Sequence, residues 1–170
     1  MKRNNKELLI KFNDKSDINE VDNMIYTVQD KINQVDTNYY LKESESPFIY
    51  FLEYSNPQEL IKKINMTEEL STKLEIIPVT CVTSNANYVI STILKKIRHK
   101  ITYNDTFNLT CHGDYLYEEN KLKIESELIE QIKNITKIEE NETCPNWDIN
   151  LYIIGEITGI NIKRKYYNQI

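Results

Sequence analysis

The chain has 170 residues, of which 40% are hydrophobic and 28% charged, and its formal net charge is -5. These values fit one or two globular modules and exclude a disordered chain. No stretch approaches the length of a membrane span, and the basic N-terminus is not followed by an apolar segment of signal-peptide length. The three dispersed cysteines, Cys81, Cys111 and Cys144, indicate free thiols. We therefore expect a cytoplasmic protein without membrane contact.

The first half of the chain predicts strands and helices in the order β-α-β-β-α-β. Ser16 or Asp17 is a candidate N-cap for the first helix, because Glu20 and a helical spacing of apolar residues follow. Pro57 is a favoured first residue for the second helix. The expected strands cover residues 6–13, 37–41, 47–53 and 75–79. This order is typical of a ferredoxin-like module, which we expect over residues 1–76.

The second half predicts another α/β module, over residues 77–170. Ser84 or Asn85 is expected to cap a helix whose inward residues are Tyr88, Val89, Thr92, Ile93 and Ile97. A strand at 106–111, a helix at 121–135 and two strands at 149–155 and 157–163 are expected to follow. The predicted fold class is therefore α+β, with a boundary between two modules near Pro78.

Four landmarks between Ile77 and Lys163 resemble a THUMP domain, a module of several tRNA-modifying enzymes such as 4-thiouridine synthetases and certain tRNA methyltransferases and pseudouridine synthases. They are the helix after Pro78-Val79, the Asp105-Thr106-Phe107-x-Leu109 entry into a strand, the helix Ile124 to Ile135, and Cys144-Pro145-Asn146-Trp147-Asp148 before an apolar strand and a Gly-containing return strand. The resemblance implies binding to tRNA. The whole layout is similar to stand-alone THUMP proteins that act as tRNA-binding adaptors for a separate enzyme of cytidine acetylation.

Two dense cationic segments are the candidate RNA-binding residues. They are Lys95, Lys96, Arg98 and Lys100, followed much later by Lys163, Arg164 and Lys165. Acidic residues concentrate between Asp105 and Glu142, a stretch that would repel phosphates wherever it is exposed. Four tyrosines near the basic residues are candidates for stacking on unpaired bases: Tyr115, Tyr117, Tyr166 and Tyr167. RNA binding requires the two cationic segments to converge in space.

No catalytic constellation is evident. Cys111, His112 and Cys144 offer zinc-ligand chemistry, but structural zinc sites use four closely spaced ligands, and core packing is the favoured interpretation. His99 is interpreted as a solvated residue at a helix end. No phosphate-binding glycine motif occurs, so neither a cofactor nor a metal is predicted. The main hypothesis is a non-catalytic RNA-binding protein. The alternatives are a protein-interaction or assembly module without RNA affinity and, third, an enzyme acting on a small molecule.

Overall fold

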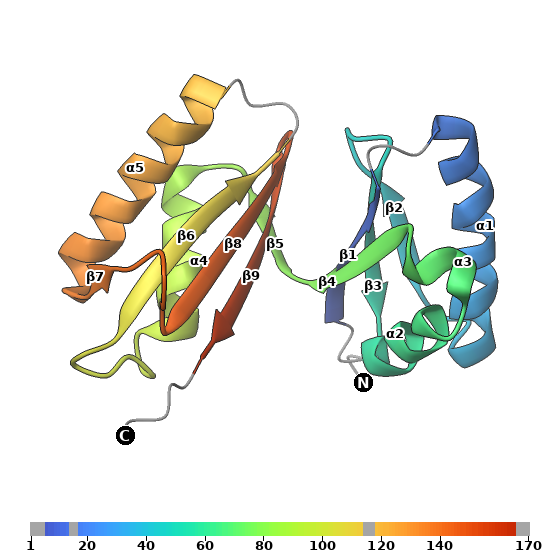
Figure 1. The fold of residues 1–170 in the computed structure, drawn as a ribbon, viewed down its shortest axis with the longest axis horizontal. Coiled ribbons are helices and arrows are strands. Elements are labelled where there is room, and N and C mark those ends of the chain that lie inside the picture. The colour runs from blue at the N-terminus through green and yellow to red at the C-terminus, as the bar shows by residue number, and fades with distance from the viewer. Residues whose placement is uncertain (1–5, 14–16, 114–117, 166–170) are drawn as a thin grey trace. The chain divides into compact units, whose positions relative to one another are not determined.

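The computed structural model describes residues 6–13, 17–113 and 118–165 and has an α+β fold (Figure 1). The chain divides into two compact units, Met1–Val79 and Thr80–Ile170, and each has its own sheet and hydrophobic core. The first unit was expected to end at residue 76, with the boundary near Pro78; Ile77 and Pro78 in fact continue the last strand of the first sheet. None of the helices that the structure describes is long and apolar enough to span a membrane.

The first unit is a four-stranded antiparallel sheet with helices on one face. Its sheet order is β2-β3-β1-β4, which is the ferredoxin-like arrangement expected from the sequence. The elements are β1 (Lys6–Phe12), α1 (Ile18–Val35), β2 (Tyr40–Glu43), β3 (Ile49–Tyr54), α2 (Pro57–Asn65), α3 (Glu68–Ser71) and β4 (Leu74–Pro78).

Helix α1 forms where the pattern predicts it. Asp17 is the N-cap, and its Oδ1 accepts a hydrogen bond from the Asn19 amide at 3.2 Å. The apolar stripe of α1 consists of Val21, Ile25, Val28 and Ile32, and all four are buried. Alternate residues of β1 and β3 complete this core from the sheet, because successive strand side chains point to opposite faces.

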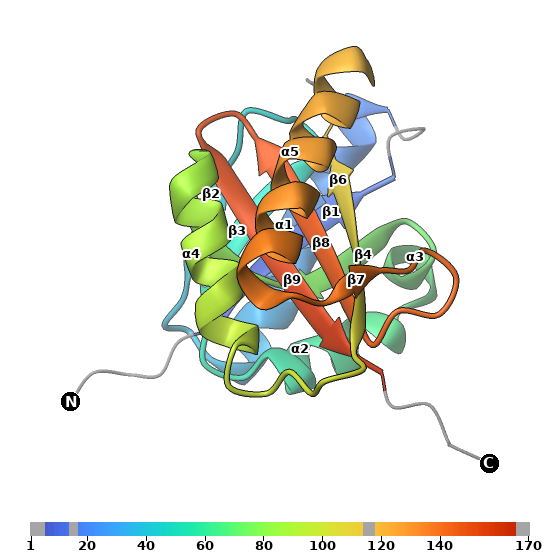
Figure 2. The ribbon, with the colours of Figure 1, turned by 90° about the vertical axis from the view of Figure 1, so that its left-hand side faces the viewer.

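The second unit is a five-stranded mixed sheet with order β5-β9-β8-β6-β7. Its elements are β5 (Thr80–Thr83), α4 (Ala86–Ile97), β6 (Thr106–His112), α5 (Glu118–Thr136), β7 (Glu139–Glu140), β8 (Trp147–Ile154) and β9 (Ile157–Arg164). Residues of both α4 and α5 join the core cluster together with Phe107, Leu109 and Ile149 from the sheet. Figure 2 shows the two helices crossing the same face of this sheet.

Three short elements were missing from the sequence prediction, namely α3, β5 and β7. Each has only two to four residues, which is too short to show a periodic pattern. The strand expected at 37–41 lies instead at Tyr40–Glu43. Tyr88 was expected to face inward and is 62% exposed, whereas Ile90 is 5% exposed and takes part in the core. The buried face of α4 therefore consists of Val89, Ile90, Ile93 and Ile97, and Tyr88 lies on the opposite, solvent-facing side of the helix.

Candidate functional site

The first cationic segment lies at the C-terminal end of α4. Asn85 caps the start of this helix, with its Oδ1 accepting from the Asn87 amide at 2.9 Å. Lys95 and Lys96 lie in the last turn and Arg98 is the C-cap, where positive charge complements the helix dipole. Lys95, Lys96, Arg98, His99 and Lys100 are all exposed. The core residues Ile93 and Ile97 fix this side of the helix toward solvent.

The loop after α4 is held by one buried carboxylate, that of Asp105, which is 7% exposed. Its Oδ2 accepts from the Thr102 amide at 3.0 Å, and its Oδ1 accepts from the Thr102 hydroxyl at 2.7 Å. The Trp147 indole Nε1, from the start of β8, also donates to Oδ2 at 3.0 Å. Asp105 was counted among the acidic residues that would repel RNA, but here it is an internal anchor.

Burial raises the pKa of Asp105, yet the carboxyl keeps a pKa below its ordinary value. Hydrogen bonds from the Thr102 amide and hydroxyl and from Trp147, together with the positive charge of Arg164, outweigh the desolvation. The carboxylate is therefore the stable form inside this network.

Arg164, at the end of β9, joins the second cationic segment to the first. Its Nη1 donates to the carbonyl oxygen of Lys100 at 2.6 Å, and its Nη2 lies 3.5 Å from Asp105 Oδ2. The guanidinium carbon lies 4.7 Å from the centre of the Trp147 ring, a cation–π geometry. Only 19% of the Arg164 side chain is exposed, and its guanidinium contacts groups of the protein itself. Direct RNA contact by Arg164 stays a prediction, and in the structure Arg164 holds the loop after α4 and the end of β9 together.

The two cationic segments therefore converge, as RNA binding requires. Figures 1 and 2 both show the loop after α4 and the end of β9 at the same end of the second unit. Lys163 and Lys165 flank Arg164 and are exposed. We call this surface the cationic corner and define it by its exposed cations, Lys95, Lys96, Arg98, Lys100, Lys163 and Lys165.

An exposed tyrosine projects from the same loop. Tyr103 is 95% exposed, and it lies between Lys100, whose carbonyl binds Arg164, and the anchor Asp105. An aromatic ring held on a fixed loop beside cations is a suitable platform for an unpaired base. Sequence reasoning missed Tyr103 because it considered other tyrosines. Those four, Tyr115, Tyr117, Tyr166 and Tyr167, lie outside the described residues.

The landmark residues of the THUMP resemblance contact one another next to this corner. Asn146 Oδ1 accepts from the Thr106 amide at 2.9 Å, and the Asn146 amide donates to the Thr106 carbonyl at 3.0 Å. The Lys165 amide donates to the Asn146 carbonyl at 2.7 Å. The turn before β8 thus aligns the starts of β6 and β8 with the end of β9.

The three residues considered as metal ligands, Cys111, His112 and Cys144, have different surroundings in the structure. Cys111 is buried in the core, and Cys144 is exposed. A ring nitrogen of His112 lies 3.0 Å from Asn150 Oδ1, and the ring stacks on Tyr152 with 4.7 Å between centroids. Within the described ranges, no three His, Cys, Asp or Glu residues are close enough to hold a metal ion.

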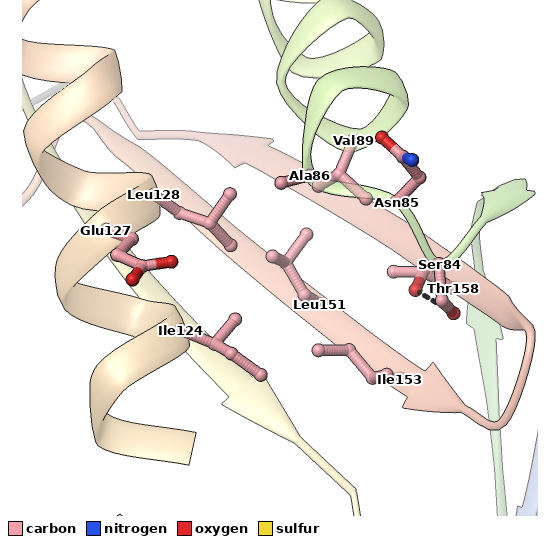
Figure 3. Close-up of a pocket in the computed structure, with 10 residues that line it drawn as sticks. All are labelled: Ser84, Asn85, Ala86, Val89, Ile124, Glu127, Leu128, Leu151, Ile153 and Thr158. Atoms are coloured by element: carbon pink, nitrogen blue, oxygen red, sulfur yellow. Dashed lines mark hydrogen bonds between the residues drawn. The ribbon is translucent and has the colours of Figure 1, made fainter. Parts of the chain in front are cut away.

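A separate pocket of about 240 Å³ opens near the start of α4, at the opposite end of the helix from the cations (Figure 3). Apolar side chains from α4, α5 and β8 form its walls, among them Val89, Leu128 and Leu151. The hydroxyl oxygens of Ser84 and Thr158 are 2.8 Å apart and share one hydrogen bond. The pocket's described lining residues include neither a histidine nor a cysteine.

No protein-family model and no curated protein matches this sequence. Solved structures do share its fold. PH1313 from Pyrococcus horikoshii Ot3 matches with a TM-score of 0.71 and 12% identity, over 93% of this chain and 54% of that one. A 4-thiouridine synthetase in complex with RNA and bound ATP matches with a TM-score of 0.60 and 15% identity, over 94% of this chain and 41% of that one. The chain thus spans about half the length of these proteins, and the expected α+β, THUMP-like fold is confirmed.

Proposed function

We propose that the chain binds RNA, and tRNA in particular, at the cationic corner, without catalysing a reaction itself. In this proposal it supports a separate RNA-modifying enzyme, for which a cytidine acetyltransferase is the expected class. The cytoplasmic location expected from the sequence is part of the same proposal and is supported by the free thiols of Cys81, Cys111 and Cys144.

One contact carries the proposal, the 2.6 Å hydrogen bond from Arg164 Nη1 to the Lys100 carbonyl. It brings together the only two dense cationic segments of a chain whose net charge is -5. Lys95, Lys96, Arg98 and Lys100 are exposed around the end of α4, where they create a local positive field that the net charge conceals, while Lys163 alternates with Arg164 and lies on the opposite face of the sheet. Lysines and arginines arranged in this way contact phosphates and fix the position of an RNA without reading its sequence.

Two further observations support this choice. An exposed tyrosine, Tyr103 at 95% exposure, lies three residues after Lys100, so an aromatic ring is close to the cations in sequence. In addition, one solved structure of the same fold is a complex with RNA, although that protein is more than twice the length of the shared region. The non-catalytic role rests on the separate engagement of the possible reactive groups described above.

The test is a tRNA titration of the intact chain and of the triple variant Lys95→Ala, Lys96→Ala, Arg98→Ala. The intact protein should bind with an affinity that depends strongly on salt concentration. The triple variant should bind about tenfold more weakly. Its plot of log affinity against log salt concentration should also be shallower, since each lost phosphate contact reduces that slope by about 0.7–0.9. Stability should change by only about 0.5 kcal/mol, because these side chains are exposed. The RNA, digested to nucleosides after incubation, should show no change in mass.

The matched control is Lys62→Ala, Lys63→Ala, Lys73→Ala, which removes the same charge from the first unit. Equal loss of affinity in this control would mean that binding follows the overall charge and that the corner is not the site. Absence of tRNA binding at low salt would instead favour a protein-interaction or assembly module.

A further inference from the structure

The side chain of Asn146, in the turn before β8, is held at its oxygen end. Its Oδ1 accepts a hydrogen bond from the Thr106 amide at 2.9 Å and another from the Thr106 hydroxyl at 3.2 Å. A backbone N–H can only donate, so the atom that meets it must be the oxygen of the carboxamide and not the nitrogen. Thr106 therefore fixes which way the carboxamide faces, and Nδ2 is turned away from the Thr106 amide.

The backbone of Asn146 is fixed as well. Its amide donates to the Thr106 carbonyl at 3.0 Å, and its carbonyl accepts from the Lys165 amide at 2.7 Å. The preceding residue, Pro145, is buried and has a restricted backbone angle. Main chain and side chain are thus both ordered before any ligand arrives, which lowers the entropy cost of a further contact.

The other end of this carboxamide is a donor without a protein partner. Nδ2 carries two N–H groups, and within the described ranges neither of them donates to another residue. Asn146 is half-buried, yet Nδ2 is accessible to solvent. A ligand that fits this group must bring a hydrogen-bond acceptor.

The position of Nδ2 in the fold indicates which acceptor that is. Asn146 holds the Lys165 amide, and Thr106 directly follows the anchor Asp105, so this donor lies at the cationic corner. The exposed lysines of the corner attract phosphates. An asparagine that recognises an adenine base uses its oxygen and its nitrogen together, and here the oxygen is occupied. A phosphate oxygen is therefore the acceptor that the surroundings favour, and asparagine side chains commonly contact phosphates in nucleic-acid complexes.

We propose that Asn146 binds the RNA directly, with Nδ2 donating a hydrogen bond to a phosphate oxygen beside Lys165. This inference rests on the proposed function and adds to it a neutral contact at the same corner. Because the carboxamide carries no charge, its contact releases no counterion from the RNA. Its share of the affinity therefore persists as the salt concentration rises, whereas the share of the lysines is lost.

The test is the substitution Asn146→Asp, measured by tRNA titration at two salt concentrations. Aspartate keeps an oxygen for the Thr106 hydrogen bonds but replaces the Nδ2 donor with a second acceptor. Affinity should fall by about tenfold, because hydrogen bonds to charged groups are among the stronger ones, and most of the loss should remain at the higher salt concentration. Urea denaturation should give similar midpoints for the variant and the intact protein.

The matched control is Asn104→Asp, at an exposed position in the loop after α4, which adds the same charge to the corner. Its loss of affinity should be about twofold at low salt and should disappear at the higher concentration, because it comes from repulsion alone and salt screens it. If Asn146→Asp behaves like this control, the hydrogen bond is absent and the inference is wrong.

A second measurement uses the intact protein and does not depend on how the variant folds. In amide NMR spectra, the side-chain NH2 resonances of Asn146 should shift when tRNA is added, while those of Asn19, on α1 in the first unit, should not. Unchanged Asn146 resonances would overturn the inference even if tRNA binds and the triple variant weakens it. Absence of any tRNA binding at low salt would overturn the proposed function and this inference together.

Discussion

The cationic corner and a groove beside β6, which we call the acidic groove because its charged lining residues are Glu125, Glu130, Glu140 and Glu142, belong to the same unit, yet they are built in opposite ways. At the corner, a buried carboxylate and a largely buried arginine form a network that joins the residues after α4 to the end of β9, and both segments carry exposed lysines. At the groove, glutamates lie beside β6 without an ion pair to a cation within the described ranges. Positive and negative side chains are thus separated into two surfaces, and a net charge of -5 says little about either.

The largest expected effect comes from removing the anchor of the corner. The substitution Asp105→Ala should lower the free energy of unfolding by about 2–4 kcal/mol, because it leaves the Trp147 N–H and the Arg164 charge without their acceptor in a mostly buried site. Urea denaturation measures this loss.

Glu125→Ala is the corresponding change at the groove and should cost only about 1 kcal/mol, since it removes one hydrogen bond at a half-exposed edge. Equal losses for the two variants would contradict the comparison, because they would show that the corner network contributes no more than a single edge contact.

A smaller effect is expected from the exposed ring of the corner. Tyr103→Ala should reduce tRNA affinity by at least about fivefold, because stacking on one base contributes about 1–3 kcal/mol. Its stability should be unchanged, since the side chain is 95% exposed. Tyr26→Ala, at a 68% exposed position of α1, is the matched control for the titration. Unchanged affinity for the Tyr103 variant would restrict the corner to phosphate contacts.

The smallest effect is the pH dependence of stability that Asp105 contributes. Its pKa is lowered in the folded state, so the stabilisation is complete above the ordinary carboxyl pKa of about 4 and is lost as pH falls through the folded value. Urea midpoints of the intact protein and of Asp105→Asn should converge below about pH 4. A difference that stays constant with pH would show that the charge of Asp105 does not contribute.

The regular elements could be predicted from the sequence because their signals are local. The stripe of α1 and the caps at Asp17 and Asn85 are visible within one or two turns of chain. The cationic segments were equally visible as composition. Their convergence was not, because the contact between Lys100 and Arg164 joins residues 64 positions apart. The role of Asp105 was missed for the same reason, since a carboxylate in an acidic stretch gives no sign that it is buried.

The acidic groove was beyond sequence analysis for a different reason. One side of it is formed at β7, which has only two residues, and so short a strand leaves no pattern in the sequence. Glu125 looked like one of many solvated acids, and only the fold places its carboxylate 2.8 Å from the Cys111 amide.

The turn between β8 and β9 has a consequence at the far end of both strands. Gly155 has a φ of 59°, and with Glu156 it forms a two-residue connection that pairs Ile154 with Ile157. This is the first of eight residue pairs in strict register, and the last is Trp147 with Arg164. A slip of this register by one residue would move every side chain of β9 to the opposite face of the sheet. The turn at one end of β8 and β9 therefore fixes the register that places Arg164, and not a neighbouring lysine, over the Trp147 ring at the other end.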